Sequence, residues 1–123
     1  MPIGRSDIDG LTEADLSELI SAGASESLYL DFKEQTYGTS DSDKRELLKD
    51  VTAFANVHGG HLVIGVKEHQ GVATEISGIS SSDIDAEVLR LDQIIRAGID
   101  PKIIGYRLRS IRLASGMHCI VIR

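Results

Sequence analysis

The sequence predicts an α+β fold, a mixed sheet of about five to six strands with three helices. Two observations carry this prediction. An amphipathic helix pattern over 47–58 runs through a pair of glycines into a fully apolar segment, 62–66. Shorter segments of strand character lie before and after this unit. We therefore expect the long helix to pack across the sheet, with 62–66 as a buried central strand.

The N-terminal elements follow from capping and alternation. Thr12 and Asp15 have the spacing of a variant capping box and Gly23 can end a helix, so a helix is expected from about 13 to 22. Apolar and polar residues then alternate over 28–33. This period of two predicts a strand with one face in water.

The long helix is expected to follow a loop over 35–43. Ser40 or Ser42 can cap its first turn, and Gly59 can end it in the left-handed conformation. Its apolar stripe consists of Leu47, Leu48, Val51, Phe54 and Ala55.

The second half of the chain reads as a hairpin, a third helix and another hairpin. Residues 72–79 form a weaker strand that should pair with the apolar strand before it. Ser82 with Asp85 is expected to cap a helix that ends at Gly98.

The last two strands are predicted over 103–114 and 117–122, joined by a tight turn. Apolar residues fall at even positions up to Leu108 and at odd positions from Ile111 onward. This change of phase predicts a β-bulge between Arg109 and Ser110.

Composition indicates one globular domain, 1–123, with an aliphatic core. The chain has 123 residues, of which 41% are hydrophobic and only 4% aromatic. No segment is long and apolar enough to cross a membrane, and the single cysteine, Cys119, is expected to be a small buried residue. We expect a cytoplasmic protein. The strand pattern runs to the last residue, which favours a domain excised from a longer chain.

The charge is unevenly distributed. The net charge is −6, yet residues 101–123 contain five basic residues and no acidic one. A local basic strip can neutralise phosphates even on an acidic protein. The alternative is a solvated outer face of the terminal hairpin, which would need no ligand.

Two separated motifs resemble the Schlafen AlbA-like domain family. The segment 26–35, ESLYLDFKEQ, precedes a helix ending AFANVHGG, which leads into a strand ending IGV. The combination is more specific than either motif alone. The resemblance covers roughly residues 11–122 and implies a nucleic-acid-binding module, of DNA or RNA, in a transcription regulator or a helicase-related, ATP-binding protein.

The resemblance also implies an alternative, a metal-dependent endoribonuclease. Carried over to this chain, the catalytic and metal-binding carboxylates fall on Glu26, Asp31 and Glu68, and Mg²⁺ or Mn²⁺ would be the cofactor. Two departures disfavour cleavage. Asp31 is one methylene shorter than the family's glutamate, and Lys67 stands where the family often has an acid. The alternative for Asp31 is an ion pair with Lys33 on the wet face of the strand.

A nucleic-acid-binding module is therefore favoured over an enzyme, with Lys33, Arg107, Arg109 and Arg112 as its phosphate contacts. A third possibility is a protein interaction or dimerisation domain, in which the terminal hairpin pairs with a second chain. Histidines 58 and 61 straddle the glycine turn without a third ligand, so a zinc site is not predicted.

Overall fold

The computed structural model describes residues 11–21, 30–55, 60–98 and 106–123. These contain three helices and six strands, in an α+β arrangement as predicted. The elements in chain order are α1 (Glu13–Ser21), β1 (Leu30–Lys33), α2 (Asp41–Ala55), β2 (His61–Ile64), β3 (Val66–His69), β4 (Val72–Ile76), α3 (Ile84–Gly98), β5 (Leu108–Arg112) and β6 (His118–Ile122). None of the helices in the described parts is long and apolar enough to span a membrane.

The strands form two sheets rather than one. Four strands make a mixed sheet in the order β1-β2-β6-β5, in which β1 and β2 are parallel and the other pairs are antiparallel. Strands β3 and β4 form a separate antiparallel ribbon. The apolar segment therefore provides β2, which lies inside the sheet and is buried along its whole length, as the sequence predicted.

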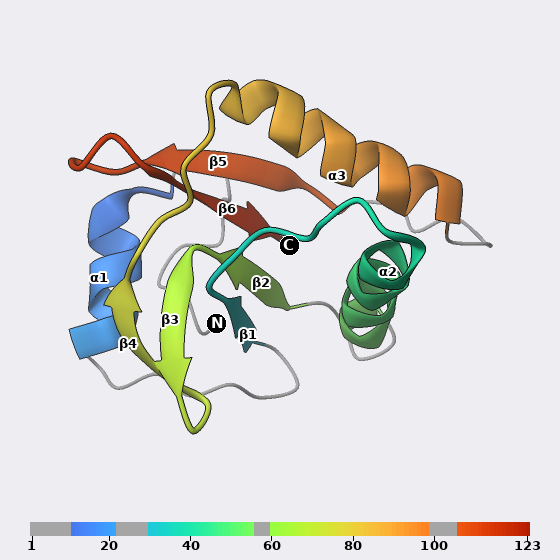
Figure 1. Ribbon diagram of the computed structural model, residues 1–123. Helices are drawn as coiled ribbons and strands as arrows, with labels where there is room; N and C mark the ends of the chain where they lie inside the picture. Colours follow the sequence, from blue (N-terminus) through green and yellow to red (C-terminus); the bar gives the residue numbers. More distant parts are fainter. Residues whose placement is uncertain (1–10, 22–29, 56–59, 99–105) are drawn as a thin grey trace.

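Each face of the four-stranded sheet is covered by a different layer. On one face, the α2–α3 face, Leu62, Ile64 and Ile120 pack against helices α2 and α3. On the other, the α1 face, Val63, Cys119 and Val121 pack against α1 and the β3–β4 ribbon (Figure 1). The strands are thus buried on both sides, and this accounts for the uninterrupted apolar run of β2.

Gly65 forms the corner at which the chain leaves β2 and enters the ribbon. Its φ of 103° is unfavourable for residues with a side chain. Its N–H donates to the carbonyl of Lys33 (2.6 Å), and its own carbonyl accepts from the N–H of Gly78 (2.8 Å) and the hydroxyl of Ser77 (3.2 Å). The thiol of Cys119, whose pKa burial raises to about 12, lies 3.6 Å from the same carbonyl oxygen. The backbone groups of this one residue therefore connect the ribbon to both β1 and β6.

The helix caps agree with the prediction in two cases and differ in the third. The carboxylate of Asp15 accepts from the N–H of Thr12 at 2.8 Å, and the hydroxyl of Ser40 accepts from the N–H of Asp43 at 3.1 Å. For α3 the prediction of Ser82 was wrong, because Asp83 accepts from the N–H of Ala86 at 3.1 Å. Both residue types cap well, so the sequence alone did not separate the neighbours.

The predicted bulge in β5 was also wrong. Strand β5 pairs with β6 without a break from Leu108 to Arg112. Leu108 packs toward α3 on the α2–α3 face, whereas Ile111 is buried on the α1 face. The apolar residues therefore shift from even to odd positions because the start of this regular strand is covered on one face and its later part on the other. The register shift of the described hairpins lies instead between Lys67 and Glu68 of the ribbon.

Replacement of Gly65 tests the corner. A Cβ at this position would lie 2.9 Å from the Cys119 sulfur and 3.2 Å from both the Gly78 Cα and the His118 carbonyl oxygen. We expect Gly65→Ala to lower the free energy of unfolding by roughly 2–4 kcal/mol, from overpacking and backbone strain together.

The matched control is Gly116→Ala, because Gly116 has a similar φ of 89° but open space around its Cβ position. Strain alone should cost it about 1 kcal/mol. Both variants can be compared by urea unfolding. Equal losses of unfolding free energy in the two variants would show that close packing around Gly65 does not add to the cost of the substitution.

Candidate functional site

Three side chains gather around Lys33 on the α2–α3 face. The Lys33 ammonium lies 3.5 Å from the carboxylate of Asp50, on α2, and 3.9 Å from that of Asp31, two residues away on β1. The Tyr37 hydroxyl donates to the same Asp50 oxygen at 2.5 Å. The predicted ion pair of Asp31 with Lys33 is confirmed, and Asp50 joins it from a second element.

The electrostatics of this cluster favour a charged lysine. Partial burial acts to lower the Lys33 pKa, but the negative charges of Asp50, Asp31 and Glu46 outweigh it and the pKa is raised. Burial raises the pKa of Tyr37, and so does its hydrogen bond to Asp50. Tyr37 is therefore a neutral hydrogen-bond donor, and Lys33 a cation held among carboxylates.

Arg90 of α3 fixes the loop that carries Tyr37. Its guanidinium donates to the backbone carbonyls of Tyr37 and Gly38 and forms a 2.7 Å ion pair with Glu87. Glu87 also accepts from the Thr36 hydroxyl at 2.5 Å. The hydrogen bonds from Arg90 outweigh partial burial and hold the Glu87 pKa below its usual range. Loop 34–40 is thus tied to α3, and this sets the position of Tyr37 over Asp50.

The residues predicted to hold a metal have other partners where they are described. Glu26 lies outside the described residues. Asp31 faces the Lys33 ammonium, and the Glu68 carboxylate accepts from the N–H of Gly71 at 2.6 Å, which closes the turn of the ribbon. Lys67, expected to intrude on the site, instead lies 3.7 Å from Glu75 across the ribbon.

A divalent ion does not fit these described carboxylates. The Lys33 ammonium already supplies a positive charge between Asp31 and Asp50. The part of the chain that the structure describes contains no group of three His, Cys, Asp or Glu side chains suited to a metal.

The predicted phosphate-binding residues lie on different faces. Backbone hydrogen bonds pair Arg107 with Arg123 in both directions, at 3.1 and 2.9 Å, and Arg109 pairs with Val121. By strand alternation these three arginines share the α1 face with Val121. Arg112 falls on the opposite face, and Lys33 lies in its acidic surroundings on that face too.

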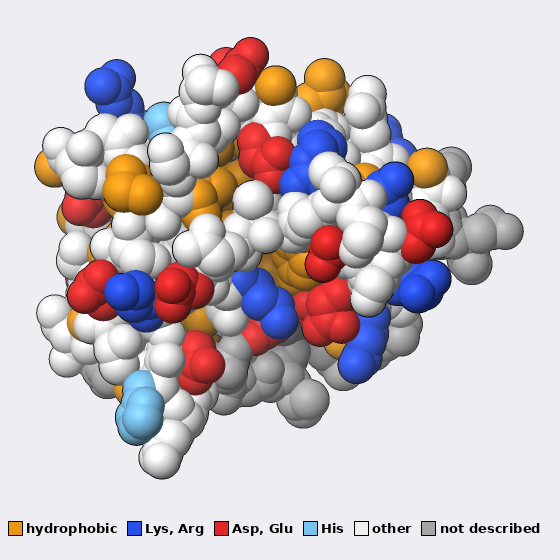
Figure 2. All heavy atoms as spheres, in the orientation of Figure 1, with side chains coloured by type: hydrophobic (Ala, Val, Ile, Leu, Met, Phe, Trp, Pro, Cys, Tyr) orange, Lys and Arg blue, Asp and Glu red, His pale blue; other side chains and the backbone are white. Residues whose placement is uncertain are grey.

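We name Arg107, Arg109 and Arg123 the arginine row. Arg107 is exposed and the other two are half-buried. The face drawn in Figure 2 shows a contrasting surface, on which acidic and basic side chains of the described residues are interspersed. The arginine row thus groups cations from neighbouring strands β5 and β6, whereas the charges over α2 and the ribbon are mixed.

His61 lies buried on β2, on the same face as the arginine row. It is 2% exposed, and neither ring nitrogen has a hydrogen-bond partner within the described residues. Burial, and then the positive charge of Arg123, lower its pKa to about 4. The imidazole is therefore neutral at physiological pH and adds no charge to the row. The Nε atom of Arg109 is likewise buried without a partner in the described structure.

Sequence reasoning missed Asp50 and Arg123 as members of these groups. Asp50 lies on the polar side of the helix pattern, where an acid reads as solvated, and only its packing against β1 brings it to Lys33. Arg123 was counted in the basic tail, but its place beside Arg107 depends on strand register. The sequence signal for Arg123 was the alternation of side chains along β6, which puts Arg123 on the same face of the sheet as Val121.

Acid should destabilise the protein through His61. In the unfolded chain the imidazole keeps its ordinary pKa of 6.5, whereas in the folded chain the pKa is about 4. The unfolded state therefore binds more protons between these values, and the free energy of unfolding falls as pH is lowered from about 6.5 to 4, by roughly 3 kcal/mol. Chemical denaturation at several pH values measures this, and His61→Leu should flatten the profile. An unchanged slope in His61→Leu would contradict the assignment.

Divalent ions give a second test. Millimolar Mn²⁺ should leave the melting temperature of the parent protein unchanged, because Lys33 occupies the position between Asp31 and Asp50. In Lys33→Met the two carboxylates lose their cation, and Mn²⁺ should then raise the melting temperature by mass action. Stabilisation of the parent by Mn²⁺ that disappears in Asp31→Asn would instead support a metal site.

Comparison with known sequences places this fold in a family. No curated protein matches the chain. The sequence model of the family described as "Schlafen, AlbA_2" matches residues 26–123, from the start of the motif ESLYLDFKEQ through β6. The match includes both motifs found in the sequence, all six strands, and both groups of charged residues described above. The chain therefore belongs to the Schlafen AlbA_2 family, a family of domains related to nucleic acids.

Proposed function

We propose that this domain binds the phosphate backbone of nucleic acids through the arginine row. The observation that carries the proposal is the grouping of Arg107, Arg109 and Arg123 on one face of two neighbouring strands. Membership of the Schlafen AlbA_2 family supports the same class of ligand. Arginine suits this role because its guanidinium is always charged and can donate two parallel hydrogen bonds to a phosphate.

The footprint differs from the four residues that the sequence suggested. Lys33 is a poor phosphate contact, since two carboxylates lie within 3.9 Å of its ammonium and would repel an approaching anion. Arg112 is exposed but projects from the other face of β5. We therefore assign the contacts to Arg107, Arg109 and Arg123, with binding that is largely independent of sequence.

Binding is favoured over cleavage because the described acidic residues have structural partners. Asp31 and Asp50 hold Lys33, and Glu68 closes the ribbon turn. The endoribonuclease reading would need these carboxylates to converge on a metal. We place the module in a larger cytoplasmic protein with a regulatory or helicase-related role, where a sequence-independent contact could position a neighbouring activity.

The salt dependence of affinity tests the arginine row. Removal of two phosphate contacts in Arg107→Ala/Arg109→Ala should weaken binding and lower the log–log salt slope by about 1.5–2 units. Fluorescence anisotropy with short single- and double-stranded DNA and RNA, from low to moderate salt, measures both quantities and shows which nucleic acid is preferred.

The matched control is Arg112→Ala/Arg96→Ala, which removes the same charge from the opposite face. It should keep most of the affinity and nearly the parent slope. Equal losses in the two double variants would mean that net charge alone governs binding, and an unchanged Arg107→Ala/Arg109→Ala variant would remove the arginine row from the interface.

A further inference from the structure

In the part of the chain that the structure describes, β5 is an edge strand of the four-stranded sheet. Arg107 and Leu113 both direct their backbone N–H groups to the β6 side, to Arg123 and Met117. In an antiparallel pair successive residues point their N–H and C=O groups to opposite sides of the strand. The outward backbone groups are therefore those of Leu108, Ser110 and Arg112, and no partner for them is found among the described residues.

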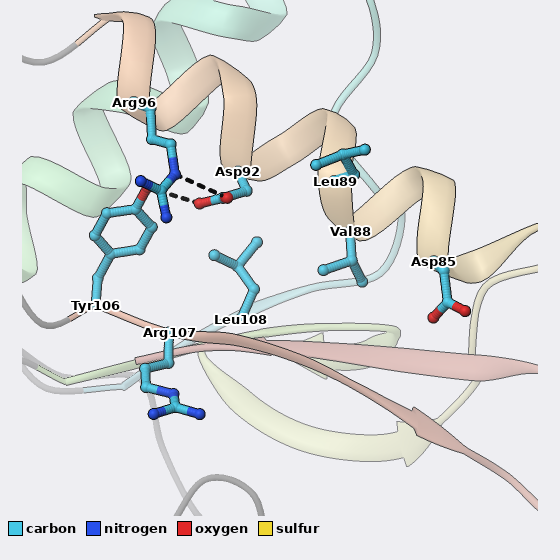
Figure 3. A pocket seen from close by; sticks show the side chains of 8 residues that line it. All are labelled: Asp85, Val88, Leu89, Asp92, Arg96, Tyr106, Arg107 and Leu108. Carbon is cyan, nitrogen blue, oxygen red and sulfur yellow. Dashed lines mark hydrogen bonds and ion pairs between the residues drawn. The ribbon is translucent and has the colours of Figure 1, made fainter.

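A groove lies between α3 and the segment 106–108, where β5 begins. It has a volume of about 280 Å³. Val88 and Leu89 of α3 and Leu108 form the aliphatic part of its lining, beside Asp85 and Arg107. Leu89 is the large apolar side chain most exposed in the described structure, at 55%. Figure 3 shows Leu108 rising toward α3 while Arg107 extends to the other side of the strand.

One end of the groove is closed by a polar network. The Tyr106 hydroxyl donates to Asp92 at 2.7 Å, and Arg96 donates to the same carboxylate at 2.9 Å while lying 5.9 Å from the centre of the Tyr106 ring. The charge of Asp92 is thus compensated within the wall. Val88, Leu89 and Leu108 then form a short apolar channel, which Asp85 and Arg107 also line, beside backbone groups without a partner among the described residues.

The opposite side of the same edge is positively charged. Arg107 and Arg109 lie on the α1 face of β5, and the strand segment 107–112 contains three arginines and no acid. A strand added at this edge would place every second side chain over the channel, and the alternate side chains next to Arg107 and Arg109. Charge complementarity therefore requires acidic residues at the alternate positions.

We propose that the β5 edge binds an extended segment of a partner protein, antiparallel to β5, in which apolar and acidic residues alternate. The apolar side chains enter the channel formed by Val88, Leu89 and Leu108, and the acidic ones pair with Arg107 and Arg109. A second copy of this chain fits less well, because two β5 strands side by side would bring together six arginines without an acid.

A synthetic peptide with a Val-Glu repeat, labelled with fluorescein, is the probe. It should bind the parent protein, whereas a peptide of the same composition with all valines before all glutamates should bind at least about tenfold more weakly. In antiparallel addition the valines exchange hydrogen bonds with Leu108, Ser110 and Arg112. N-methylation of the valines should therefore abolish binding, and N-methylation of the glutamates should not.

Protein variants test the same edge. Ser110→Pro removes an outward N–H without breaking a bond to β6, and should lower peptide affinity by about tenfold or more, while Ser110→Ala should not. Leu89→Asp should weaken binding through the channel. Circular dichroism and melting temperature establish that each variant is folded. The N-methylated peptides keep the test decisive if Ser110→Pro fails to fold.

Three outcomes would overturn the proposal. The first is equal affinity for the Val-Glu repeat and for the peptide with all valines before all glutamates. The second is an equal loss of affinity on N-methylation of the valines and of the glutamates. The third is a dimer in analytical ultracentrifugation that Ser110→Pro dissociates, which would assign the edge to self-association. The proposal is separable from nucleic-acid binding, because Ser110→Pro and Leu89→Asp leave the arginine row intact and should not change the salt slope for DNA or RNA.

Discussion

The backbone hydrogen bonds of Gly65 hold the two sheets of this domain together. At this residue the chain turns out of the central strand. The Gly65 N–H donates to Lys33, and the Gly65 carbonyl accepts from Gly78 and Ser77 and is contacted by Cys119. Buried backbone groups need partners, so the short and crowded corner leaves the ribbon few alternative positions. The ribbon must then cover the α1 face of the sheet, and helices α2 and α3 cover the other.

Coverage of both faces explains how so few aromatic residues suffice for a stable core. Two layers of aliphatic side chains enclose β2 and β6, whose central residues are fully buried. Close packing of branched side chains on both faces makes the interior sensitive to added volume, and it excludes water from groups such as His61. Burial therefore keeps the His61 imidazole neutral, and its ring nitrogens without described partners lower the stability of the fold.

The same arrangement separates the charges of the domain into two environments. On the α2–α3 face, Asp31 and Asp50 surround Lys33, so that this group is internally compensated. On the α1 face, Arg107, Arg109 and Arg123 lie together at the end of strands β5 and β6. An acidic protein can in this way present a local cationic surface, and strand β5, which carries part of it, has one edge without a strand partner among the described residues.

The sequence by itself determined the helices, the buried central strand, the terminal hairpin and the burial of Cys119, because caps, periodicity and apolar runs act over a few residues. The run 62–66 is an example in which local chemistry left little choice. Only the tertiary structure decided that the six described strands divide into four and two, that Asp50 joins Asp31 beside Lys33, and that Arg112 is separated from Arg107 and Arg109. These features depend on which strands pair and in which register. In a strand, successive side chains point to opposite faces of the sheet, so a shift of the register by one residue would exchange the two faces. The register is therefore set by the need to bury both faces against different layers at the same time. No short stretch of sequence specifies this, because the layers come from distant parts of the chain.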